Sequence, residues 1–188
     1  LLIPLYLIPL YLIPYTSLAQ RSKDGAKVVA TANNIVNEYT TLTANAASGA
    51  TTITVAASAL NANGRFSGAL AAGDLIMIIQ IQGATILGAP DMFTPAIGFP
   101  YDSTWGGITN YNDCGNWEFA QVFSVPNGTS ITIDCPLTNN YTSSGRVVVV
   151  RVPRYSSLTV NSGGSISCDP WNNLSIGGVC AIEVENNT

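Results

Sequence analysis

Alternating apolar and polar positions recur in short runs along most of the chain, with turn residues between them. Residues 36–44 and 51–55 alternate β-branched and polar side chains on either side of a turn at 48–50, which predicts a hairpin. Residues 75–81 form a nearly continuous apolar run with glycine near both ends, which predicts a strand buried on both faces at the centre of the core. Asp74, just before this run, is expected to make a turn hydrogen bond.

Residues 118–125 and 130–134 show the same alternation on either side of Pro126, Asn127 and Gly128. Asn-Gly accepts the positive φ angles of a tight turn. The sequence therefore predicts a second hairpin here.

Residues 146–152 predict a further strand, which ends at Pro153. After it, residues 157–168 and 177–184 are short alternating segments interrupted by paired glycines, which are typical of the stacked coils of a β-solenoid. We expect an all-β fold, in which a compact β-sandwich or barrel-like domain leads into the first rungs of a right-handed parallel β-helix. The expected boundaries are 28–155 for the domain, with a long irregular loop at 83–116, and 156–188 for the start of a truncated β-helix.

The N-terminal segment 1–19 has the pattern of a signal peptide. Residues 1–15 are apolar apart from tyrosine hydroxyls, and small residues at Ser17 and Ala19 predict cleavage near Ala19. The segment is short and interrupted by prolines, so we expect no stable membrane span in the mature chain. Residues 20–27 predict a flexible lead. The alternative for the apolar segment is a retained strand that pairs with a neighbouring subunit.

The composition agrees with export and restricts the chemistry. Charged residues make up 10% of the chain, whereas Thr, Ser, Asn, Ala and Gly are abundant, as in extracellular β proteins. The net charge is -4 and the seven basic residues are scattered, so nucleic acid is not an expected partner. The chain has no histidine, which excludes Ser-His-Asp and Cys-His nucleophiles and histidine-ligated zinc. We therefore expect no catalysis by this chain.

Four cysteines are disulfide candidates, namely Cys114, Cys135, Cys168 and Cys180. In an oxidising compartment they can form two disulfides, with three alternative connectivities, and we expect sequential pairing. The alternative is that they are buried free thiols. Their spacing contains no C-x-x-C motif, so it does not indicate a zinc site.

Residues 83–116 mix glycine, proline, polar and aromatic residues without a period, which predicts a long loop of the kind that often carries function. No cofactor is expected apart from Ca²⁺, although no EF-hand motif is present. Its candidate oxygen ligands are Asp102, Asn110, Asn112 and Asp113. The candidate sugar-stacking side chains, which can instead cover the edge of the core, are Tyr101, Trp105, Tyr111 and Trp117.

Other charged residues have both a chemical and a structural interpretation. Glu118 and Asp134 can form the carboxylate pair of a glycoside hydrolase if they face each other, but acids at strand ends usually meet water. Three arginines can clamp an anionic polysaccharide, namely Arg146, Arg151 and Arg154. The favoured alternative is that they are solvated charges that discourage pairing at a strand edge.

A family resemblance is carried by four segments, residues 65–84, 115–125, 151–160 and 177–181. They are similar to the N-terminal region of large secreted, adhesin-like surface proteins of gliding bacteria. Those proteins are often exported by the type IX route and commonly continue into a glycine-rich β-helix. The resemblance implies a secreted or cell-surface location and an architecture, and it implies no catalytic or ligand residues.

Together these features predict an extracellular structural or adhesive module of a secreted or cell-surface bacterial protein, without catalysis of its own. Its expected partners are surface glycans or other cell-surface proteins. The alternative is a glycan-binding accessory region of a polysaccharide-active enzyme, in which a downstream β-helix carries the catalysis. Exposed, coplanar aromatic rings at residues 99–117 would favour glycan binding, and buried rings would disfavour it.

Overall fold

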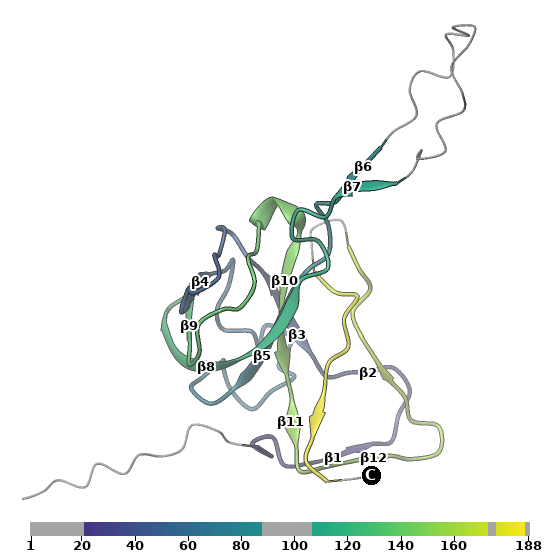
Figure 1. Ribbon diagram of the computed structural model, residues 1–188. Helices are drawn as coiled ribbons and strands as arrows, with labels where there is room; N and C mark the ends of the chain where they lie inside the picture. The colour runs from purple at the N-terminus through teal and green to yellow at the C-terminus, as the bar shows by residue number, and fades with distance from the viewer. Residues whose placement is uncertain (1–20, 88–106, 173–175, 187–188) are drawn as a thin grey trace, which may run out of the picture.

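The computed structural model describes residues 21–87, 107–172 and 176–186, and the chain in these ranges is all-β, as predicted (Figure 1). The helical element in these ranges is a 3-10 turn at Ser143–Gly145. No helix of the described residues has the length and apolar character needed to cross a membrane. The predicted signal peptide at 1–19 lies outside the described residues.

One antiparallel sheet of six strands forms the body of the molecule (Figure 1). Across the sheet the strands follow the order β3 (Glu38–Thr41), β10 (Val147–Val152), β5 (Leu75–Gln80), β8 (Trp117–Asn127), β9 (Ser130–Ile133) and β4 (Thr52–Thr54). An antiparallel bridge between Leu42 and Val55 joins the ends of the two edge strands. The sheet therefore curls into a half-barrel, which is the barrel-like form of the predicted domain.

Alternation along the strands places one set of side chains inside the half-barrel. Ile76 and Ile78 of β5 lie on this side with Val147 and Val149 of β10, and all four are buried. The same core contains Leu42, Ala46, Ile53, Val55, Leu60, Leu70, Val122, Ile131, Ile133, Leu137 and Tyr141. Because burial of a large aliphatic side chain contributes about 1.5–3 kcal/mol, this cluster is a main source of the stability of the half-barrel.

Two of the strand predictions need correction. Residues 36–44 and 51–55 do not form a hairpin, because β3 pairs with β10 and β4 pairs with β9, and the two segments meet at a single bridge. β5 lies inside the sheet, as predicted, but only one of its faces is buried, and the other is half-buried. Alternation identifies a strand, whereas its partner depends on the whole sheet. The predicted hairpin of β8 and β9 is confirmed, but β8 extends to Asn127 and the turn lies at Gly128 and Thr129. Neither Asn127 nor Gly128 has the positive φ that the Asn-Gly pair predicts.

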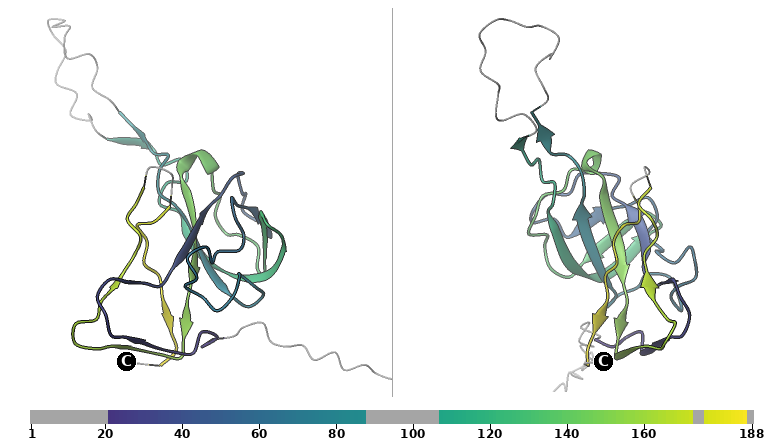
Figure 2. Two further views of the ribbon diagram at one scale, coloured as in Figure 1. Left: turned by 180° about the vertical axis from the view of Figure 1, so that it is seen from behind. Right: turned by 90° about the vertical axis from the view of Figure 1, so that its right-hand side faces the viewer.

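Three short pairs of parallel strands lie beside the half-barrel (Figures 1 and 2). They are β1 (Ala26–Val29) with β12 (Ser157–Val160), β2 (Asn34–Ile35) with β13 (Ile166–Ser167), and β11 (Arg154–Tyr155) with β14 (Glu183–Val184). β10 continues through Pro153 into β11, so these pairs start directly from the main sheet. A further pair, β6 (Thr85–Ile86) with β7 (Ile108–Asn110), is antiparallel and projects from the opposite end of the molecule.

The described residues between Arg154 and Ile182 form one turn of chain, and we call residues 154–182 the coil. β11, β12 and β13 follow one another around it, and β14 then returns to the edge of β11. Residues 26–35 run alongside with nearly constant register, because Ala26 lies opposite Ser157 and Asn34 lies opposite Ile166. The predicted β-helix requires a repeating array of such turns, and the described residues contain a single turn whose end pairs in parallel with its beginning.

The expected flexible lead at 20–27 is, in its described part, hydrogen-bonded to the coil. The Asp24 carboxylate accepts a hydrogen bond from the Arg154 backbone N–H (2.7 Å), and the Asp24 N–H donates to the Arg154 carbonyl oxygen (3.0 Å). β1 then begins at Ala26. These bonds span about 130 residues of sequence, so polarity alone could not predict them.

Candidate functional site

The structure describes only part of the predicted aromatic platform. Three of the predicted site residues lie outside the described residues, namely Tyr101, Asp102 and Trp105. Tyr111 is 65% exposed in the turn after β7, and Trp117 is 53% exposed at the start of β8. The Trp117 ring meets the Phe119 ring edge-on, at an interplanar angle of 81°. The two described rings of the platform are exposed, which favours a binding role. Phe119 is not part of the predicted platform, and its perpendicular ring does not extend a flat surface from Trp117.

The described candidates for calcium ligands hydrogen-bond within the protein. The Asn110 side-chain oxygen accepts from the Asn112 N–H (2.9 Å), and the Asn112 amide donates to the Gly83 carbonyl oxygen (3.0 Å). The Thr142 hydroxyl donates to the Asp113 carboxylate (3.3 Å). These bonds close the base of the β6–β7 hairpin. Across the described ranges, no three acidic or cysteine side chains are grouped as a metal site.

The predicted disulfides are absent, because the structure contains four free thiols, Cys114, Cys135, Cys168 and Cys180. Cys114 donates a hydrogen bond to the Ile81 carbonyl oxygen (3.2 Å) just before β8, whereas Cys135 follows the end of β9. The Asp134 N–H bonds to the Gln121 carbonyl oxygen, four residues into β8. Four residues of strand span more than about 10 Å. Cys114 and Cys135 therefore lie farther apart than the roughly 7 Å between Cα atoms that a disulfide can bridge.

Cys168 and Cys180 are neighbours around Tyr39 of β3. Burial raises the pKa of the Tyr39 hydroxyl, and the nearby Cys168, Asp169 and Cys180 raise it further. Burial, and then the neighbouring Cys168, also raises the pKa of the Cys180 thiol. A raised pKa keeps a thiol protonated and a poor nucleophile. The two cysteines are therefore close, as sequential pairing requires, but no bond joins them.

The hydrogen bonds of Glu118 hold the fold together and do not suit a catalytic acid. Its carboxylate accepts hydrogen bonds from the backbone N–H groups of Thr138 (2.9 Å) and Asn139 (3.1 Å) and from the Tyr141 hydroxyl (3.0 Å). Burial alone would raise the pKa of Glu118, but these hydrogen bonds outweigh burial and lower it. Asp134 instead binds a glutamine of β8 (2.7 Å). A glycosidase acid needs a raised pKa, so Glu118 is unsuited to that role.

We expect Glu118→Gln to lower the free energy of unfolding at neutral pH by about 1.5–3 kcal/mol, which is the usual contribution of hydrogen bonds to a charged group. Because the folded-state pKa is depressed, the carboxylate stabilises the fold above the unfolded-state pKa, and this contribution is lost as the pH falls through the folded-state pKa. The difference between the two proteins should therefore shrink in acid. Urea unfolding at neutral and acidic pH measures it.

The control for this experiment is Asp134→Asn, which removes an exposed carboxylate from the same sheet. It should change the free energy of unfolding by less than about 0.5 kcal/mol. If the Glu118→Gln difference stays the same from neutral to acidic pH, the hydrogen-bonded carboxylate is not what stabilises this corner of the half-barrel.

Arg151 and Arg154 are buried, which overturns both sequence interpretations of these arginines. The Arg151 guanidinium donates to the Asp74 carboxylate (2.9 Å) and lies 3.9 Å from the centroid of the Phe66 ring. Lys23 makes a second ion pair with Asp74 (2.5 Å). A buried arginine is tolerated because it is paired in this way, and it is not available to clamp a polysaccharide.

Arg154 joins the coil to the half-barrel. It forms an ion pair with Glu183 of β14 and donates to the Gly73 carbonyl oxygen (3.2 Å) and to the Gln121 side chain (3.2 Å). Arg146, the third candidate for the clamp, is exposed at the start of β10. The three arginines therefore do not form one surface.

The last part of the coil is held against the main sheet by polar side chains. The fully buried Asn37 donates to the Ala181 carbonyl oxygen (2.7 Å) and accepts from the Ala181 N–H (3.2 Å). Arg65 makes a bidentate pair with Asp169, at 2.7 and 3.1 Å. Bidentate pairs of this kind fix orientation as well as distance.

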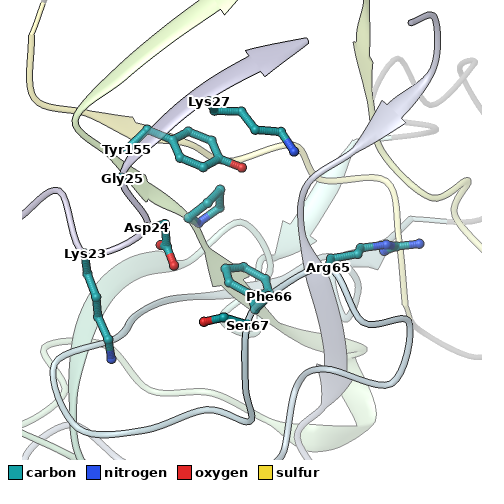
Figure 3. Close-up of a pocket in the computed structure, with 9 residues that line it drawn as sticks. Lys23, Asp24, Gly25, Lys27, Arg65, Phe66, Ser67 and Tyr155 are labelled. Atoms are coloured by element: carbon teal, nitrogen blue, oxygen red, sulfur yellow. The ribbon is translucent and has the colours of Figure 1, made fainter. Parts of the chain in front are cut away.

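A pocket of about 380 Å³ lies where the N-terminal segment, the loop around residue 66 and β11 meet (Figure 3). Its lining residues are Lys23, Asp24, Gly25, Lys27, Arg65, Phe66, Ser67, Pro153 and Tyr155. Three of the seven basic residues of the chain line it together with one acid, although the net charge of the protein is -4. The pocket combines a positive lining with aromatic walls, and its volume is in the range of small-molecule sites.

Two of the three cations in the lining are already paired with acids. Arg65 is paired with Asp169, whereas Lys23 shares the single charge of Asp74 with Arg151. Both side chains are therefore held by partners within the protein.

Lys27 and Tyr155 keep their polar groups available. Lys27 lies on the same face of β1 as the buried Val29, and it is itself half-buried. Within the part of the chain that the structure describes, the Lys27 ammonium has no ion-pair partner and the Tyr155 hydroxyl has no hydrogen-bond partner. Both side chains extend toward the side of the pocket where Arg65 lies (Figure 3). Burial, and then the nearby Asp24, raises the pKa of Tyr155 to about 12, so its hydroxyl stays protonated at neutral pH.

Sequence reasoning did not find this pocket, because its lining comes from segments more than 100 residues apart and belongs to no motif. The one local signal is the position of Lys27. Alternation in β1 places it on the inward face with Val29, where an unpaired charge is costly.

No protein-family model matches this chain, and no curated protein matches it. Among solved structures, the tailspike gp61 of Pseudomonas phage phi297 is 19% identical, with a TM-score of 0.36 over 73% of this chain and 20% of that chain. The gp54 tailspike of Acinetobacter baumannii bacteriophage AP22, in complex with A. baumannii capsular saccharide, is 12% identical, with a TM-score of 0.37 over 74% of this chain and 24% of that chain. This chain thus spans a quarter or less of their lengths. Because the identities and TM-scores are low, no conclusion about function rests on these likenesses.

Proposed function

We propose that this chain is an extracellular structural module that carries the start of a parallel β-solenoid and has no catalysis of its own. The parallel pairs carry this proposal. β14 returns to the edge of β11 after one turn of 29 residues, from Arg154 to Glu183 (183 − 154 = 29). β1 and β2 cover one side of the same turn in parallel register. The low charge and the abundance of Thr, Ser and Asn support an extracellular location.

The uncovered side of the coil supports the proposal that further solenoid turns add to it. β12 and β13 each pair with one strand, and within the described ranges no strand lies on their second edge. The Glu185 N–H donates to the Tyr155 carbonyl oxygen (3.0 Å), and the Asn186 N–H donates to the Ser156 carbonyl oxygen (3.3 Å). These bonds direct the chain toward the second edge of β12. Open edges attract further strands, so a parallel strand is the partner that this edge fits.

The polar groups of the described residues support a structural rather than a catalytic role. The chain has no histidine, and Glu118 and Asp134 are held by different partners. The buried charges Asp74, Arg151 and Arg154 connect loops to strands and are enclosed by them. Each of these groups already has a role in holding the fold together.

A tandem duplication of residues 154–182 tests this function, because it adds one coil of the same length after the first. If the coil is a solenoid turn, the added copy covers the open edges of β12 and β13, and their amide hydrogens should exchange about tenfold more slowly or better. The control is a duplication one residue shorter, since a slip of one residue turns inward side chains outward. Equal exchange in the two variants, or rapid proteolysis of the added coil in both, would contradict the proposal.

A further inference from the structure

We propose that the pocket lined by Lys27, Phe66 and Tyr155 binds an acidic sugar unit, a pyranose ring that carries one carboxylate. The pocket has an unpaired cation, aromatic walls, and polar groups that both donate and accept hydrogen bonds. Each of these three features matches one part of such a ligand. The proposal concerns a binding site and does not depend on whether the coil continues as a solenoid.

The Lys27 ammonium is the group of the pocket that would pair with the ligand carboxylate. Its side chain is half-buried on the inward face of β1, and no carboxylate of the described residues pairs with it. An ammonium without a carboxylate partner is available to a ligand carboxylate, and a charge-assisted hydrogen bond of this kind is stronger than one between neutral groups. The neighbouring cations Lys23 and Arg65 are held by Asp74 and Asp169, which leaves Lys27 as the basic side chain of the lining without an ion-pair partner among the described residues.

Phe66 provides a wall that is held in place before any ligand arrives. The Arg151 guanidinium lies against its ring at 3.9 Å, and Arg151 is itself fixed by Asp74 and by the Gly68 carbonyl oxygen (2.8 Å). A fixed ring reduces the entropy that is lost on binding. The C–H groups of a pyranose pack on such an apolar surface.

The remaining polar groups fit hydroxyls better than a second negative charge. The Tyr155 hydroxyl and the exposed Ser67 hydroxyl can donate, and the Asp24 carboxylate, which uses Oδ2 to accept from the Arg154 N–H, has Oδ1 available to accept. The Asp24 carboxylate would repel a phosphate dianion in the pocket more strongly than it repels a ligand with a single negative charge. The Arg65 fork, which would suit a phosphate, is occupied by Asp169. A hydroxylated ring with a single carboxylate therefore satisfies the lining, whereas a phosphate does not.

The test is calorimetric titration of the chain with a short oligomer of glucuronic acid, with a glucose oligomer of the same length and with inorganic phosphate. We expect the acidic oligomer to bind, and Lys27→Met, which keeps most of the apolar stem, to weaken binding about tenfold or more. Lys27→Arg should restore most of the affinity, which separates loss of charge from misfolding. Tyr155→Phe should weaken binding a few-fold through the loss of one hydrogen bond.

The matched control is Arg21→Gln, which removes one positive charge from an exposed position outside the pocket and should leave the affinity unchanged. Several outcomes overturn the proposal. They are equal binding of the glucose oligomer, phosphate binding that displaces the sugar, an unchanged affinity in Lys27→Met, and no binding of the acidic oligomer by the folded chain.

Discussion

Replacing Asp74 with asparagine should lower the free energy of unfolding by about 3–5 kcal/mol, the loss typical of breaking a buried ion pair from one side. Asp74 is 4% exposed, and its two carboxylate oxygens bind Lys23 and Arg151. One of them also accepts from the Ala71 N–H (2.8 Å). Asparagine keeps the shape of the side chain but leaves the buried Arg151 guanidinium without a carboxylate at ion-pair distance among the described residues.

Urea unfolding of the wild type and the variant measures this loss, and two further variants identify its cause. Lys23→Gln removes the more exposed partner of Asp74 and should cost no more than about 1 kcal/mol. Combining Asp74→Asn with Arg151→Met removes both buried charges, so the double variant should be more stable than the sum of the two single losses predicts. Additive losses would show that the charges do not act as a pair, and the large effect would then need another explanation.

The sequence could predict a large part of the half-barrel, because alternation is a local property. The strands at 75–81, 118–125, 130–134 and 146–152 lie where the pattern indicates, to within one or two residues. Partner choice could not be predicted in the same way. The polar alternation of 36–44 is equally compatible with a hairpin and with pairing to β10, and the burial of the whole sheet decides between them.

The charges were harder to interpret, because a charged residue at a strand end has the same local pattern whether it meets water or a buried partner. Arg151 and Arg154 flank Pro153 and were expected to be solvated, yet both are buried against acids from distant segments. The turn hydrogen bond expected of Asp74 is present, at the Ala71 N–H. Its larger role in neutralising Arg151, 77 residues away, is a tertiary effect without a local signal.

In the coil, the positions of the strands could be predicted from the sequence, but the N-terminal partner of β12 could not. Glycine pairs and short strands indicated solenoid-like segments at 157–168 and 177–184, and the parallel strands β12, β13 and β14 lie in these segments. That an N-terminal strand would cover one side of the turn was not predictable, because β1 and β12 are 131 residues apart in register. The resemblance to surface proteins of gliding bacteria remains a prediction, since no comparison tests it.

Replacing Gly177 with alanine should disrupt the end of the coil, because the added methyl group meets both an unfavourable backbone angle and a steric clash. Gly177 has a φ of +89°, which costs an L-residue about 1–2 kcal/mol. A Cβ there would also lie 2.3 Å from the Pro170 carbonyl oxygen and 2.8 Å from the Asp169 carbonyl oxygen, and such overpacking costs about 1–3 kcal/mol more. Both obstructing atoms are backbone atoms of the coil itself, so relief requires the segment at Gly177 to move away from the segment at Asp169 and Pro170.

Amide hydrogen exchange measures which part of the coil the Gly177→Ala substitution opens. The Gly178 N–H is bonded to the Asp169 carbonyl oxygen and the Ala181 N–H to Asn37, so both amides should lose protection. Gly128→Ala is the matched control, because nothing lies within 4 Å of a Cβ at that position and its φ is not positive. Unchanged exchange at Ala181 would contradict the expectation. If the amides of β5 keep their protection while the coil opens, the half-barrel is stable by itself. If they lose it too, the coil and half-barrel unfold as one unit, and the hydrogen bonds of Arg154 to Gly73 and Gln121 are among the contacts that join them.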